Sequence, residues 1–197
     1  LGLAGIKDAY IKMMEEANIY GIIIASEEAR RLDWPHSPHI QIQEGQNMDA
    51  IQVCTKAPDF TLQVGFDNEI RLSNYQGKQV LLSWHPLAWT SVCTDQMRAL
   101  EVHFDDFAAK NTVAIGLSVD AAPSKKAWAT VLSIENTPLV SDFWPQGKVS
   151  QDYGVFMENH GFSGRVNVLV DAQGIVKWVK VYPLGELPDI NEILAAL

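Results

Sequence analysis

The chain has 197 residues, of which 47% are apolar and 20% are charged, and its formal net charge is −9. A chain of this length and composition folds around one core, with room for an appendage, and is too apolar for a disordered protein. The negative charge argues against nucleic-acid binding, which depends on Lys and Arg at phosphates, and no run of about 18 apolar residues could span a membrane.

The first fifty residues differ in pattern from the rest of the chain. Apolar residues recur at helical spacing near the N-terminus, and Ser26 is placed to cap a second helix. The stretch from Trp34 to His39 ends this pattern, because each of its prolines disfavours helical geometry in the residue before it. We therefore expect an N-terminal extension over residues 1–50, helical plus a linker, followed by a second domain over residues 51–197.

From Val53 onward, the pattern alternates between strands and helices. We expect strands over residues 80–84, 113–119, 139–141, 166–170 and 176–181, and helices from residue 93, over 125–132 and over 189–197. The helix after residue 93 carries one apolar stripe, formed by Met97, Leu100, Phe104, Phe107 and Ala108. The last two strands flank residues 171–174, Asp-Ala-Gln-Gly, which predict a hairpin. This order predicts an α/β protein with a mixed central sheet flanked by helices.

The loop between the first buried strand and the long helix holds the candidate nucleophile. Cys93 lies in or near the first helical turn, where unpaired backbone N–H groups and the positive end of the dipole favour an anion. The thiolate is the reactive form of cysteine. Pro86 can shield the sulfur, and Thr90 offers it a hydroxyl. Because Cys93 also continues the apolar stripe, a role as a small buried apolar residue stays open.

Pro86, Thr90 and Cys93 resemble the PxxxTxxC signature of the peroxiredoxins, thiol-dependent peroxidases on a thioredoxin-like fold. Three other segments resemble the family's opening strand, the turn before its central strand and the strand bearing its active-site arginine; these are residues 57–62, 72–78 and 165–174. The resemblance covers residues 53–197. It implies a thioredoxin-like peroxiredoxin fold with a partly helical N-terminal extension.

The resemblance also implies a mechanism. The Cys93 thiolate would attack hydrogen peroxide or an alkyl hydroperoxide and become a sulfenic acid, which an external thiol or a thioredoxin- or glutaredoxin-like protein would reduce. Thr90 and Arg165 would contact the sulfur and the separating oxygens, although spacing alone favours a surface charge for Arg165. The supporting residues would be Val92, through its backbone N–H, His85 and Gln96. We expect no cofactor, and a homo-oligomer, dimeric or larger.

The sequence departs from the family pattern at Gln96, where many members carry an acid three residues after the cysteine. His85-Pro86 resembles the one-cysteine branch, and no cysteine follows Cys93. Cys54 is the one candidate for a resolving cysteine, but we interpret it as a strand residue and expect a one-cysteine mechanism. His85 either helps to hold the charge of Cys93 or is a buried histidine with satisfied hydrogen bonds.

Other functions remain in view. A peroxiredoxin-like redox sensor or binding module, which passes oxidation to a partner protein, is the alternative to the enzyme; a thiol-disulfide oxidoreductase is disfavoured because the sequence has no CxxC. His36 and His39 lack a third ligand nearby, so we expect no metal site. We expect the tryptophans in the core or the site wall; these are residues 84, 89, 128, 144 and 178. The N-terminal charges and scarce cysteines favour a cytoplasmic protein.

Overall fold

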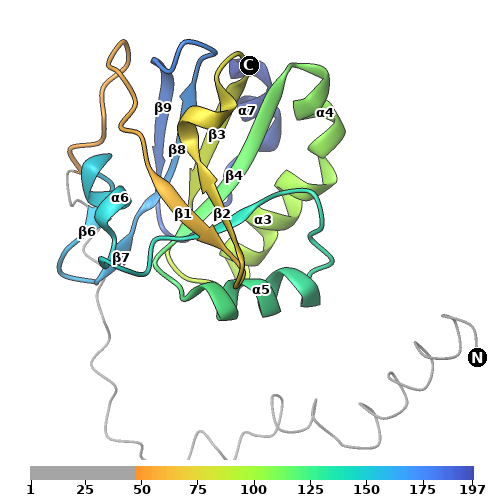
Figure 1. Ribbon diagram of the computed structural model, residues 1–197, viewed down its shortest axis with the longest axis vertical. Helices are drawn as coiled ribbons and strands as arrows, with labels where there is room; N and C mark the ends of the chain where they lie inside the picture. Colours follow the sequence, from red (N-terminus) through yellow and green to blue (C-terminus); the bar gives the residue numbers. More distant parts are fainter. Residues whose placement is uncertain (1–47) are drawn as a thin grey trace, which may run out of the picture. The chain divides into compact units, whose positions relative to one another are not determined.

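A seven-stranded mixed sheet forms the centre of the computed structural model, which describes residues 48–197 (Figure 1). The strand order is β2-β1-β5-β4-β3-β8-β9. Its strands are β1 (Thr61–Val64), β2 (Asn68–Arg71), β3 (Gln79–Trp84), β4 (Thr112–Ser118), β5 (Leu139–Ser141), β8 (Arg165–Val170) and β9 (Val176–Tyr182). Strands β3, β4 and β5 run parallel to one another. Strand β8 pairs antiparallel with β3, and β1 pairs antiparallel with β5. The prediction of a mixed α/β sheet is confirmed.

Helices and loops cover both faces of the sheet. The helical elements are η2 (Leu72–Tyr75), α3 (Ser91–Val102), α4 (Phe104–Ala109), α5 (Ala122–Val131), α6 (Lys148–Asp152) and α7 (Ile190–Ala196). One apolar cluster joins Leu81 of β3 to residues of α3, α4, α5 and α7. The other joins Val80, Leu82 and Trp84 to α6 and to the chain before β1. This alternation along β3 follows from the two-residue period of a strand, and both faces are buried as predicted.

The single long helix expected after Cys93 is wrong, because the chain breaks at His103 into α3 and α4. Asp105 and Asp106 lie in the first turn of α4, where carboxylates favour a new helix start. The break rotates the apolar stripe, so that Phe107 stays buried while Phe104 is 38% exposed. Periodicity cannot detect such a break when apolar residues continue on both sides of it.

The sequence pattern did not predict the short elements of the fold. These are the β1–β2 hairpin, helix α6, and a ribbon of β6 (Phe156–Met157) with β7 (Phe162–Ser163). Each is too short for a period to be counted reliably. The predicted helix over 125–132 begins earlier, at Ala122, because Pro123 occupies its first turn, where a missing N–H costs no hydrogen bond.

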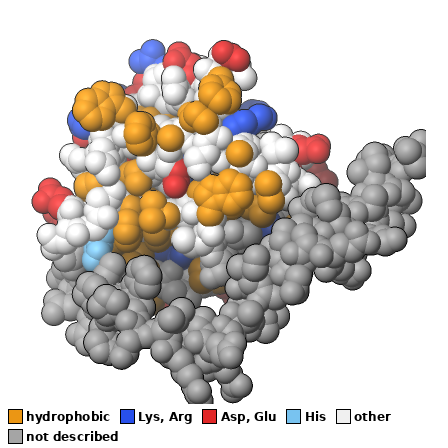
Figure 2. Space-filling model, turned by 90° about the horizontal axis from the view of Figure 1, so that it is seen from below, with side chains coloured by type: hydrophobic (Ala, Val, Ile, Leu, Met, Phe, Trp, Pro, Cys, Tyr) orange, Lys and Arg blue, Asp and Glu red, His pale blue; other side chains and the backbone are white. Residues whose placement is uncertain are grey.

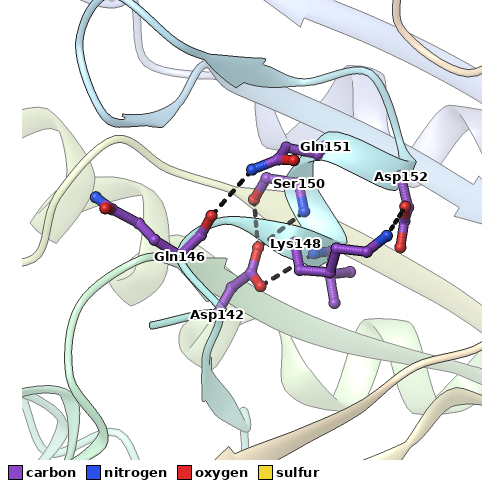
Figure 3. A network of polar contacts seen from close by, with 7 residues as sticks. Asp142, Gln146, Lys148, Ser150, Gln151 and Asp152 are labelled. Atoms are coloured by element: carbon purple, nitrogen blue, oxygen red, sulfur yellow. Dashed lines mark hydrogen bonds and ion pairs between the residues drawn. The ribbon is translucent and has the colours of Figure 1, made fainter. Parts of the chain in front are cut away.

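Helix α6 is anchored by the buried carboxylate of Asp142, which follows β5 (Figure 3). Asp142 accepts hydrogen bonds from the backbone N–H groups of Val149 (3.0 Å) and Ser150 (2.8 Å) and from the Ser150 hydroxyl (2.7 Å). The Ser150 hydroxyl also accepts the indole N–H of Trp84 (3.1 Å). Burial raises the pKa of Asp142, and these hydrogen bonds oppose the shift. The network ties α6 to the last residue of β3.

Glu101 of α3 performs a similar function for the loop that precedes β5. Its carboxylate accepts the backbone N–H groups of Glu135 (2.9 Å), Asn136 (3.0 Å) and Thr137 (2.8 Å). Burial raises the pKa of Glu101, but hydrogen bonds from these residues outweigh it and lower the pKa to about 2. A carboxyl with a lowered folded-state pKa stabilises the fold above its ordinary pKa of 4.5, and this stabilisation is lost as the pH falls toward 2.

The variant Glu101→Gln is therefore expected to lose about 1 kcal/mol of the free energy of unfolding near neutral pH, a value discounted for solvent screening. The loss should shrink as the pH falls below about 4.5, because the unfolded chain of the unmodified protein then binds a proton at Glu101 that the folded protein does not, which lowers its stability. Urea unfolding at neutral pH and near pH 3 measures both effects. Glu135→Gln is the matched control, since that side chain is exposed and should change neither value. A loss that is equal at both pH values would contradict this assignment.

The predicted extension over residues 1–50 lies almost wholly outside the described residues. Of its last residues, Ala50 is buried and Met48 packs against the core cluster that contains Val80 and Trp84. His36, His39 and most of the predicted linker fall in the part that is not described. Within residues 48–197, no helix combines the length and the apolar character that a membrane crossing needs.

Candidate active site

Cys93 lies in the first turn of α3, at the carboxyl end of β3. The backbone N–H of Thr94 donates to the carbonyl of Thr90 (2.9 Å), so the N–H groups of Val92 and Cys93 precede the helix's own hydrogen bonds. The Cys93 side chain is 1% exposed and packs in the apolar cluster between the sheet and the helices. The sulfur thus occupies a dry position at the positive end of a helix, where an anion is favoured.

Arg165, the first residue of β8, points its guanidinium at this sulfur. Its Nη2 donates to Cys93 Sγ at 3.5 Å and to the carbonyl of Leu184 at 2.7 Å. Its Nε donates to the same carbonyl at 3.2 Å, and its Nη1 donates to Gln96 Oε1. The side chain is 2% exposed, which excludes the alternative of a surface strand charge. These contacts hold the planar fork in one orientation.

Gln96 links this arginine to the end of β3. While its Oε1 accepts from Arg165, its Nε2 donates to the Ser83 hydroxyl (2.8 Å) and to the carbonyl of Trp84 (3.2 Å). An amide carries no charge, and no ion pair of Arg165 occurs among residues 48–197. Gln96 therefore orients the guanidinium without neutralising it, and the positive charge remains available to the sulfur.

Thr90 and Pro86 lie in the loop before α3. The Thr90 hydroxyl donates to the carbonyl of Leu87 (2.9 Å), so in this structure it is not hydrogen-bonded to Cys93. Pro86 is partly buried beside His85. The loop is held by the Asp120 carboxylate, which accepts the backbone N–H of Ala88 at 2.8 Å. The structure thus places Thr90 next to the helix start, with its hydroxyl turned to the loop.

His85 is fully buried at the carboxyl end of β3, and its ring lies beside Lys125. Burial, together with the positive charges of Lys125 and Arg165, lowers the pKa of His85 well below 6.5. The ring is therefore neutral at neutral pH, so any help that it gives to the Cys93 thiolate does not come from a positive charge on the imidazole. The alternative of a satisfied histidine is wrong, since Nδ1 has no hydrogen-bond partner among the described residues.

Lys125 is the residue near the site that sequence reasoning missed. It lies on α5, and its side chain is 0% exposed, although a lysine in an amphipathic helix usually belongs to the solvated face. Its Nζ lies 2.7 Å from the Ser118 hydroxyl and 3.3 Å from His85 Nε2. The signal that could have found it is helical spacing, because Lys125 lies three residues after Ala122 and three before Trp128, both of which are buried.

Cys54 lies in an exposed turn with a φ of 65°, so its interpretation as a strand residue is wrong. Its backbone N–H donates to the carbonyl of Val176 (2.8 Å), beside the turn from β8 to β9. That turn lies at the amino end of β3, because Val170 pairs with Val80. Cys93 follows the opposite end, roughly 15 Å away along the strand. A Cys54–Cys93 disulfide would need a large rearrangement, because bonded cysteines have Cα atoms within about 7 Å.

The tryptophans divide between the core and the surface. Trp84 and Trp128 are buried as predicted. Trp89 is 54% exposed and Trp144 is 83% exposed, so neither lies in the core, which was one of the two places predicted for them. The Trp89 indole is nonetheless fixed, because it donates to the Ser124 hydroxyl at 3.0 Å. On the face that Figure 2 shows, several groups of apolar side chains reach the surface between polar ones.

Known proteins resemble the chain over this same region. The model of the AhpC/TSA family matches residues 53–179. Alkyl hydroperoxide reductase E of Mycobacterium tuberculosis is 39% identical over 151 residues, which cover 75% of this chain and 98% of the relative. Peroxiredoxin-2 of Mus musculus is 33% identical over 152 residues, which cover 73% and 76% of the two chains.

Solved structures agree with these relatives. The reduced 2-Cys peroxiredoxin of Plasmodium vivax matches with a TM-score of 0.66 at 33% identity, over 72% of this chain and 78% of that one. Mycobacterium tuberculosis AhpC matches with a TM-score of 0.66 at 21% identity, over 74% and 95% of the chains, and supports the fold alone. The chain belongs to the AhpC/TSA family, the peroxiredoxins, and has their thioredoxin-like fold.

Proposed function

We propose that this chain is a thiol peroxidase that reduces hydrogen peroxide or small alkyl hydroperoxides with Cys93 as the nucleophile. The observation that carries the proposal is the 3.5 Å contact between Arg165 Nη2 and Cys93 Sγ at the start of α3. A buried cation and the first-turn N–H groups both favour the thiolate, which is the attacking species. The names of the relatives point to the same chemistry.

In the proposed step, the Cys93 thiolate attacks one peroxide oxygen. A sulfur–oxygen bond forms as the oxygen–oxygen bond breaks, so that the sulfur is oxidised to a sulfenic acid and the peroxide is reduced. The second oxygen leaves as hydroxide or alkoxide and takes a proton to become water or an alcohol. Arg165 and the N–H of Val92 would stabilise the charge on the separating oxygens.

The other residues of the site would shape this pocket. Gln96 would hold the Arg165 guanidinium in place, and Pro86 would keep water from the sulfur. The Thr90 hydroxyl would turn from the carbonyl of Leu87 toward the sulfur or the bound peroxide. Fixed donors of this kind stabilise developing charge without reorganising during the reaction.

Reduction of the sulfenic acid would require a thiol from outside the chain. A first thiol would form a mixed disulfide with Cys93 and release water, and a second would release the Cys93 thiol and a disulfide. The location of Cys54 beside the opposite end of β3 supports this one-cysteine cycle. A small thiol or a thioredoxin- or glutaredoxin-like protein of the cytoplasm would supply the electrons.

Exposed aromatic side chains such as Trp144 support a homo-oligomer, dimeric or larger.

The proposal is tested by treating the reduced protein with one equivalent of hydrogen peroxide and measuring its intact mass. We expect a gain of one oxygen atom at Cys93, together with a change in tryptophan fluorescence on mixing. In the presence of excess dithiothreitol, peroxide should then be consumed catalytically. Intact peroxide after incubation with protein whose cysteines are both reduced would overturn the assignment. Loss of two hydrogens instead would replace the one-cysteine cycle with a Cys54–Cys93 bond.

A further inference from the structure

Lys125 is a second buried cation near Cys93, and the proposed mechanism does not use it. Its ammonium donates to the Ser118 hydroxyl (2.7 Å), and that hydroxyl donates to the Asp120 carboxylate (2.7 Å). Its Nζ also lies 3.3 Å from His85 Nε2. Among residues 48–197, no carboxylate pairs with Lys125 directly. Burying a lysine is costly, so these contacts need an explanation beyond packing.

Several charged or titratable groups influence the charge of this ammonium, each from a different element. They are Cys93 of α3, His85 after β3, Asp120 after β4 and Asp142 after β5, while Arg165 of β8 acts on the same histidine. Burial lowers the pKa of Lys125 to about 7, and the negative charges of Asp120, Cys93 and Asp142 oppose the shift. Lys125 therefore changes its charge close to neutral pH.

The coupling between Lys125 and Cys93 must act in both directions. If a thiolate at Cys93 favours the ammonium, then the ammonium favours the thiolate by the same free energy. Arg165 contacts the sulfur directly, whereas Lys125 acts through the low-dielectric interior, where charges interact more strongly than in water.

Lys125 also determines the protonation of His85. An ammonium can only donate hydrogen bonds, so the Nε2 of a neutral His85 must accept from it, and Nδ1 carries the proton. The imidazole then cannot take a proton from the site while Lys125 is charged. Its ring packs 5.2 Å from that of Trp128, which belongs to the same apolar cluster as Cys93.

We propose that Lys125 is a positioning residue for peroxide reduction, a buried cation that stabilises the Cys93 thiolate and holds His85 in its neutral Nδ1–H form. This inference rests on the proposed peroxidase function. It assigns to α5, a helix outside the PxxxTxxC loop, a part in the reactivity of the sulfur.

The test compares the second-order rate constant for hydrogen peroxide in the unmodified protein and in Lys125→Met, from about pH 5 to pH 9. We expect Lys125→Met to be slower by about tenfold below pH 6, a typical size for coupling between two sites. The difference should disappear as the pH rises above about 7, because the unmodified protein then loses the same charge. Lys126→Met removes an exposed lysine from the same helix and should leave the rate constant unchanged.

A ratio of rate constants that stays the same at every pH would overturn the proposal, because a purely structural role does not follow the titration of Lys125. Equal rates in both proteins would overturn it as well. If the unmodified protein consumes no peroxide, the proposed function fails, and the coupling is then tested without activity.

That second measurement follows the ¹³Cε signal of labelled Lys125 against pH by NMR, in the unmodified protein and in Cys93→Ser. It also tests the coupling between Lys125 and Cys93 if the Lys125→Met variant does not fold. We expect the Lys125 signal to titrate at lower pH in Cys93→Ser, because the thiolate that favours the ammonium is gone. Identical titrations would show that the lysine and the sulfur are not coupled.

Discussion

Replacing Cys93 with serine is expected to abolish peroxide reduction, with a loss of at least about 10⁴-fold in the second-order rate constant. Serine fits the same buried position at the start of α3, so the fold and the contacts of Arg165 with Gln96 and Leu184 should persist. A serine hydroxyl, however, remains protonated at neutral pH, and it has no sulfur to be oxidised to a sulfenic acid. Stopped-flow fluorescence and peroxide consumption with dithiothreitol measure the loss.

Cys54→Ser is the matched control, because it makes the same chemical change at an exposed turn. It should leave both the oxidation step and the turnover with dithiothreitol unchanged. Turnover that survives in Cys93→Ser would show that Cys93 is not the nucleophile. Turnover that disappears in Cys54→Ser would show that Cys54 takes part in the cycle, and either result would contradict the proposal.

Arg165→Met is expected to slow the oxidation step by about 10²- to 10³-fold, the usual cost of removing a donor that stabilises developing charge. The change removes the cation 3.5 Å from Cys93 Sγ and releases the carbonyl of Leu184 and the amide of Gln96. Arg165→Lys keeps the charge but loses the planar fork, so it should recover only part of the rate.

The measurement is the rate constant for hydrogen peroxide, together with near-ultraviolet circular dichroism to confirm that each variant is folded. Arg98→Met serves as the control, since Arg98 lies on the exposed side of α3 and should not affect the rate. A folded Arg165→Met variant with the rate of the unmodified protein would show that the guanidinium contact has no role in the reaction.

Features that depend on neighbouring residues were predictable from the sequence. The hairpin at residues 171–174 is closed by Asp171, whose carboxylate accepts the backbone N–H groups of Gln173 (2.9 Å) and Ile175 (2.8 Å). Asp189 caps helix α7, because its side chain accepts a hydrogen bond from the backbone N–H of Asn191. Such contacts are made within a few residues, so the local pattern specifies them.

The sequence pattern alone could not specify the contacts of the site. Arg165 reaches Cys93 across 72 residues of chain, and Lys125 reaches His85 across 40. Spacing alone favoured a surface charge at Arg165, and only the family resemblance pointed to its role. No resemblance pointed to Lys125, which differs from the exposed Lys126 only in the direction in which α5 presents it to the sheet.

By itself, the sequence determined that a cysteine follows a buried strand and opens a helix, because strand and helix periods and turn residues act over short distances. The tertiary structure decided which charges surround that cysteine. The antiparallel register that sets Trp84 opposite Val166 brings Arg165 to the carboxyl end of β3, and the packing of α5 buries Lys125 beside His85. Register and packing depend on contacts between distant segments, which a single segment's pattern does not contain.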